Sequence, residues 1–64
     1  MLTEKELLYV EDAIGHEKSI ISIIDESITK LRDDDLVSFM ENEREVHVST
    51  LDKLMGTLKE EAHG

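Results

Sequence analysis

Apolar residues recur along two stretches of the chain at alternating intervals of three and four residues. This is the spacing of a helix that buries one stripe against other helices. In the first stretch the apolar stripe consists of Leu7, Val10, Ile14, Ile21, Ile24, Ile28 and Leu31. In the second stretch it consists of Val37, Met40, Leu51, Leu54 and Leu58. The pattern predicts two long helices that pack along these stripes.

Three polar residues interrupt the two stripes near their middles. Glu17 interrupts the first stripe, and Arg44 and His47 interrupt the second. A polar side chain on a buried stripe needs a partner, because desolvation without one costs free energy. With a turn near position 33, the rise per residue places all three at a similar height. We therefore expect a buried polar layer with a Glu17–Arg44 ion pair and His47 hydrogen-bonded nearby.

Local signals set the expected ends of the helices. Thr3 followed by Glu6 is a capping-box arrangement, which predicts that the first helix spans about 3–31. The acidic stretch that follows predicts a turn at 32–34, with Asp33 or Asp34 capping a second helix of about 34–60. The expected fold class is all-α, with residues 1–64 forming one domain, a two-helix antiparallel hairpin.

The apolar surface of this hairpin is wider than two helices can cover. Beyond the stripes, further apolar residues lie at Leu8, Ile20, Ile23, Phe39, Val46, Val48 and Met55. That width favours a four-helix bundle, which two copies of a hairpin build most simply. We therefore expect a homodimer or a higher homo-oligomer. The alternative is a binding module that docks on the helices of a different protein.

Composition narrows the classes of partner and location. The 64 residues include 16 acidic and 7 basic side chains, for a formal net charge of −9, and no cysteine. This charge argues against nucleic acid and anionic membranes as partners, because both would repel the chain. No apolar run has the length of a membrane span, and the first residues have no basic leader before an apolar core. A cytoplasmic protein is expected.

The order of these features resembles a known family. The stretch LTEKELLYVEDAIGHEKSIISIIDESITKL, a short acidic turn and then DDLVSFMENEREVHVSTLDKLM are similar to the short spore-coat F family, whose members are ferritin-like helical hairpins. The resemblance implies a ferritin-like four-helix bundle, a place in the spore coat and other coat proteins as further partners. The family's metal-binding glutamate and histidine correspond to Glu17 and His47. Position 44 departs from the pattern, because it holds arginine where the Glu-x-x-His motif has glutamate.

The function expected from these features is a non-catalytic structural or assembly protein that needs no cofactor. The alternative is a small ferritin-like protein that binds iron or zinc at the core of the dimer, with a degenerate di-metal oxidase-like site. Its candidate ligands are Glu17, His47 and Glu43, and the last two are four residues apart on one helix. Carboxylates and imidazoles suit both metals. Against metal, the guanidinium of Arg44 adds a fixed positive charge.

Overall fold

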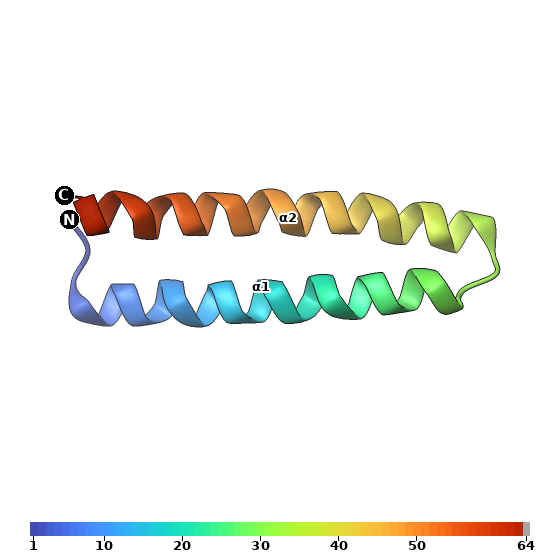
Figure 1. The fold of residues 1–64 in the computed structure, drawn as a ribbon, viewed down its shortest axis with the longest axis horizontal. Coiled ribbons are helices and arrows are strands. Elements are labelled where there is room, and N and C mark those ends of the chain that lie inside the picture. The colour runs from blue at the N-terminus through green and yellow to red at the C-terminus, as the bar shows by residue number, and fades with distance from the viewer. Residues whose placement is uncertain (64) are drawn as a thin grey trace.

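The protein is a hairpin of two antiparallel helices. The computed structural model describes residues 1–63, in which α1 spans Glu4–Lys30 and α2 spans Asp34–His63 (Figure 1). The Cα trace extends 46 × 14 × 12 Å, so the molecule is a long rod two helices wide. The expected all-α helical hairpin is confirmed. The second helix runs through Gly56, as expected, and continues three residues beyond the predicted end.

The start of α1 is fixed by its own side chains. The Thr3 hydroxyl accepts a hydrogen bond from the Glu6 amide at 3.1 Å, and the Glu6 carboxylate accepts one from the Thr3 amide at 2.9 Å. Each side chain thereby satisfies an amide that the helix leaves without a partner. The bond from the Thr3 amide also lowers the pKa of Glu6 below its ordinary value.

The turn between the helices uses an extended residue and an aspartate cap. Leu31 leaves the helix with φ −77° and ψ 142°, while its amide still donates to the Ser27 carbonyl at 2.9 Å. Asp33 then caps α2, because its Oδ1 accepts from the Leu36 amide at 3.0 Å. Asp34 and Asp35 follow in the first turn, where a negative charge suits the positive end of the helix dipole.

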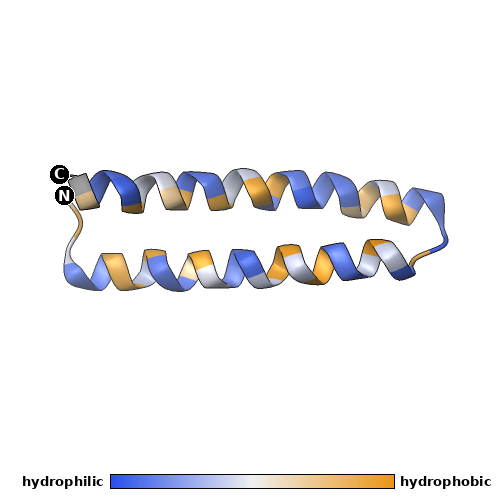
Figure 2. Cartoon of the chain, in the orientation of Figure 1, coloured by the Kyte–Doolittle hydropathy of each residue, from blue (hydrophilic) through white to orange (hydrophobic). Residues whose placement is uncertain are grey.

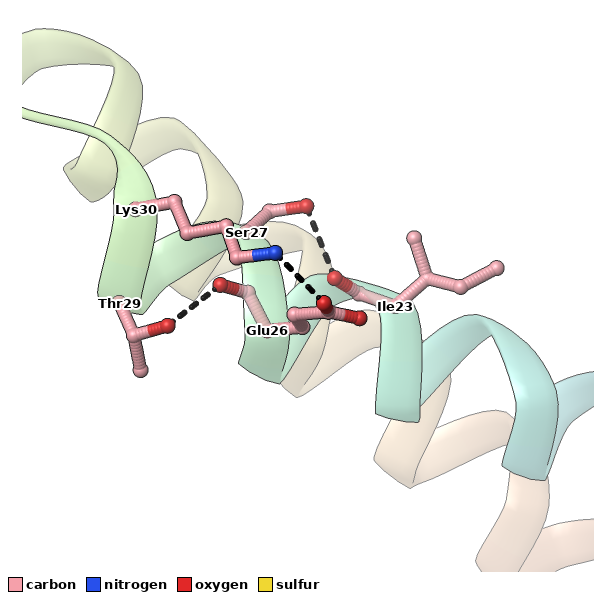
Figure 3. A network of polar contacts seen from close by, with 5 residues as sticks. All are labelled: Ile23, Glu26, Ser27, Thr29 and Lys30. Atoms are coloured by element: carbon pink, nitrogen blue, oxygen red, sulfur yellow. Dashed lines mark hydrogen bonds and ion pairs between the residues drawn. The ribbon is translucent and has the colours of Figure 1, made fainter.

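The last turns of α1 carry a local network of polar contacts (Figure 3). Ser27 donates its hydroxyl to the Ile23 carbonyl at 2.8 Å, and Thr29 donates to the Glu26 carbonyl at 2.6 Å. The Lys30 ammonium lies 2.7 Å from a Glu26 carboxylate oxygen, an ion pair one turn long. These contacts stay within α1 and leave the outer surface of the helix open to solvent.

The apolar stripes face each other but remain thinly covered. Figure 2 shows hydrophobic residues on the inner edges of α1 and α2 along most of the hairpin. Among the residues that the structure describes, Ile24 alone is buried, with 5% of its surface exposed. The other stripe residues are half-buried. Neither described helix combines the length and apolar character needed to cross a membrane.

Candidate functional site

Glu17 and His47 meet between the helices near the middle of the hairpin. The Glu17 Oε2 atom of α1 lies 2.6 Å from the His47 Nδ1 atom of α2. The two side chains are 16% and 26% exposed, respectively, so both are largely shielded from water. The structure thus brings together the two residues that the sequence placed at one height, and each satisfies the polar group of the other.

A second carboxylate lies on the other side of the imidazole. Glu43 precedes His47 by one helical turn, and its Oε2 atom is 3.8 Å from His47 Nε2. That distance is too long for a hydrogen bond. The Glu43 side chain is 42% exposed, so it lies at the mouth of the cluster rather than inside it. We call Glu17, Glu43 and His47 the His47 cluster.

Arg44 does not belong to the His47 cluster, which corrects the expected Glu17–Arg44 pair. Its Nε atom lies 2.5 Å from Asp25 Oδ1, and its Nη2 atom lies 3.3 Å from Asp25 Oδ2. The Arg44 and Asp25 side chains are 44% and 49% exposed, so this ion pair is at the surface. The expected buried layer of Glu17, Arg44 and His47 is therefore wrong with respect to Arg44.

Solvation explains the change of partner. A guanidinium placed beside Glu17 would lose most of its water, and the attraction of a buried ion pair often fails to compensate for that loss. Asp25 offers Arg44 two carboxylate oxygens on a flank that water still reaches. The sequence signal that was missed is Asp25 itself, an acid beside Ile24 on the stripe, at a height that the long side chain of Arg44 can reach.

The Asp25–Arg44 pair shifts the titration of both partners. The hydrogen bonds from the Arg44 side chain lower the pKa of Asp25, and those same bonds raise the pKa of Arg44. Both groups are therefore charged at neutral pH. The pair links α1 to α2 on one side of the hairpin only.

The His47 cluster presents a carboxylate-oriented imidazole. With a neutral ring whose Nδ1–H donates to Glu17, the lone pair of Nε2 points toward the Glu43 side. In this arrangement a carboxylate, here that of Glu17, fixes the tautomer of a ligating histidine. One copy of the chain thus supplies two candidate metal ligands, the Nε2 atom of His47 and the Glu43 carboxylate.

The residues of one chain do not fit the two-metal centre of ferritin-like proteins. That centre needs a glutamate at the position of Arg44, and Arg44 is turned away to Asp25. Within the described part of the chain, no group of three or more histidine and acidic side chains has a geometry that could hold a metal ion. The Glu17 Oε2 atom, moreover, is already engaged by His47.

Comparisons with known proteins add no identification. No protein-family model, no curated protein and no solved structure matches this chain. The function therefore has to be argued from the hairpin itself.

Proposed function

We propose that this protein is a non-catalytic structural protein whose working form is a homodimer, in which two hairpins make a four-helix bundle. One observation carries the proposal: two long helices, each with an apolar stripe along most of its length, bury a single residue, Ile24, among those described. Several large apolar side chains remain more than 40% exposed instead. They are Met1, Leu8, Tyr9, Ile23, Leu36, Phe39, Val46 and Met55.

The exposed area supports a partner of ordinary size. The chain exposes 5087 Å² for a mass of 7.3 kDa. A compact monomer of this mass would expose about 4,200 Å². The observed area of 5087 Å² exceeds this value by about 900 Å², and one side of a standard protein interface buries about 800 Å². A second layer of helices therefore accounts for the surface that the hairpin leaves open.

A structural role agrees with the rest of the site. The His47 cluster joins α1 to α2 at mid-height, where a polar contact on an apolar seam favours one register over its slipped alternatives. The resemblance to the short spore-coat F family supports the same role. It adds the spore coat as a location beside the cytoplasm and other coat proteins as further partners. The ferritin-like arrangement of the dimer is part of this proposal.

Analytical ultracentrifugation over a range of chain concentrations tests the proposal. We expect a species of twice the chain mass that dissociates on dilution with loss of helical circular dichroism, because a hairpin with one buried residue has too small a core to fold alone. A helical species that stays monomeric at every concentration would overturn the proposal and favour docking on a foreign helix.

Metal binding is a second candidate, which the geometry of His47 and Glu43 favours. Nε2 of His47 and Oε2 of Glu43 are 3.8 Å apart and come from one turn of α2. Two copies would supply two imidazoles and two carboxylates, a donor set suited to zinc or iron. In the dimer, Glu17 would orient the ring rather than ligate.

Isothermal titration calorimetry with Zn²⁺ and Fe²⁺ on metal-free protein tests this candidate. We expect one ion per two chains, with binding abolished by His47→Ala. His16→Ala serves as the matched control, since His16 is exposed and outside the cluster. The absence of micromolar binding, or equal loss with His16→Ala, would rule the candidate out.

A further inference from the structure

The hairpin has two broad open faces, one on each side of the plane that contains its helices. The Asp25–Arg44 ion pair marks one of them, because it bridges α1 and α2 on that side. We call this side the Arg44 face. Lys18 lies two turns before Asp25, and Glu41 lies one turn before Arg44, so both belong to the same side. The Arg44 face at mid-height therefore carries several charged side chains, with the apolar Val48 one turn after Arg44.

The opposite side carries large apolar side chains on both helices, and Glu43 lies among those of α2. At 3.6 residues per turn, residues two or five positions apart point about 140° to 160° away from each other around the helix. Ile20 and Ile23 have these spacings from Asp25, and Phe39 and Val46 have the same spacings from Arg44. We call this side the Phe39 face, defined by Tyr9, Ile20, Ile23, Phe39 and Val46.

The residues of the Phe39 face are exposed, except for the half-buried Ile20, and most of them lie at one height. Tyr9, Ile23, Phe39 and Val46 are each more than half exposed. Figure 3 shows the side chain of Ile23 extending outward from α1. Because Glu17 lies opposite His47 and Leu2 lies opposite Glu61, residues 18–25 of α1 lie opposite residues 39–46 of α2. Four of the five apolar residues thus form one patch across both helices.

We infer that the Phe39 face is the surface on which a second copy of this chain sits. The inference rests on the proposed homodimer and adds to it the face that is used. Covering the Arg44 face instead would desolvate an ion pair that is now about half exposed, at a cost that its mutual attraction need not repay. Covering the Phe39 face removes mainly apolar side chains from water, with the partly exposed Glu43 carboxylate at the edge of the patch.

A second copy fits this surface better than a foreign partner does. In a two-fold dimer the same patch serves both chains, so it must be complementary to itself. A patch of apolar side chains that spans both helices at one height meets this requirement, with the Glu43 carboxylate, four residues after Phe39 and three before Val46, at its edge. The excess area of the hairpin is close to that of one side of an ordinary interface.

Sedimentation of four single variants tests the choice of face. Phe39→Glu and Val46→Glu place a charge on the Phe39 face. Met55→Glu is the matched control on the Arg44 face, because Met55 lies about three turns after Arg44. Leu8→Glu is a second control, at an exposed apolar side chain that is not among the five that define the Phe39 face. We expect the first two to raise the dissociation constant of the dimer by roughly tenfold to a hundredfold, and the two controls to change it by less than about threefold.

Hydroxyl-radical footprinting of the unmodified protein tests the same inference, even where a variant fails to fold. We expect oxidation of Phe39 and Tyr9 to fall as the chain concentration rises through the dimerisation range, while oxidation of Met55 stays unchanged. A dimer that protects Met55 and leaves Phe39 reactive would overturn the choice of face while the homodimer stands. A wild-type protein that never sediments above the monomer mass would overturn both.

Discussion

Arg44 and His47 interrupt the same apolar stripe, three residues apart, yet they lie in different surroundings. His47 turns inward to Glu17, with 26% of its side chain exposed, whereas Arg44 turns outward to Asp25 and stays 44% exposed. The difference follows from charge and length, because a long guanidinium reaches water while an imidazole at the seam does not. Helical spacing predicted the height of both residues but could not predict this choice, which depends on solvation.

The Glu17–His47 contact leads to a prediction about paired substitutions. His47→Leu alone leaves the Glu17 carboxylate, 16% exposed, without its partner. We expect that variant to lose about 1 to 3 kcal/mol of unfolding free energy. Glu17→Leu/His47→Leu removes both polar groups from an apolar seam, and we expect it to be at least as stable as His47→Leu.

Urea denaturation of the wild type, both single variants and the double variant, at one chain concentration, measures this cycle. Additive losses from the two substitutions would contradict the prediction, because they would mean that the two side chains contribute independently.

The Asp25–Arg44 pair leads to a prediction about pH. The hydrogen bonds from Arg44 lower the pKa of Asp25 in the folded state. The pair therefore stabilises the fold at neutral pH, and this contribution is lost as the pH falls through the lowered pKa of Asp25. We expect wild type to melt slightly above Asp25→Asn at neutral pH, with the gap closing in acid. A gap that widened toward acid in thermal melts would contradict this assignment.

At the scale of the helices, local chemistry predicted the ends well. The capping pair of Thr3 and Glu6 forms as expected, and of the two candidate caps for the second helix the structure uses Asp33. These signals act within one turn, so the surrounding fold does not need to be known. The far end of α2 was underestimated, because the pattern weakens after Leu58 while the helix continues to His63.

Gly15 and Gly56 lead to a prediction about helix stability. A Cβ atom built at either position meets nothing within 4 Å in the hairpin. Replacing each with alanine should therefore add about 1 kcal/mol, because glycine is a poor helix former. We expect each variant to melt about 4 to 8 °C above the wild type at equal chain concentration.

The same melts check the inferred dimer. Both glycines lie outside the Phe39 face, so neither substitution should weaken association. A lower melting temperature for Gly15→Ala would show that a partner packs closely over that position, which would contradict the face inferred above.

At the scale of the molecule, the periodicity of the sequence predicted the hairpin and its excess of apolar surface. It could not show how that surface divides between the two open faces, because that requires the register fixed by Glu17 with His47 and by Leu2 with Glu61. It also could not identify Asp25 as the partner of Arg44, because Asp25 belongs to the other helix. Contacts across the hairpin are the part of the structure that local patterns leave undetermined.

The net charge leads to a prediction about salt. Each chain carries a formal charge of −9, so two copies repel each other at long range. Salt shortens that range from about 10 Å at 0.1 M to about 3 Å at 1 M. We expect sodium chloride to tighten the dimer, as measured by sedimentation at constant pH. Weaker association at high salt would instead indicate ion pairs between the copies.

The Leu2 amide donates to a Glu61 carboxylate oxygen at 2.8 Å, which ties the first residues to the last turns of α2. The first residues and the end of α2 therefore lie at the pole opposite Arg32 and Asp33 (Figure 1). Anything fused to either end, such as a fluorescent reporter or a tandem repeat, emerges at that single pole. The loop pole stays unobstructed, and a short tether suffices to string successive hairpins into one polypeptide.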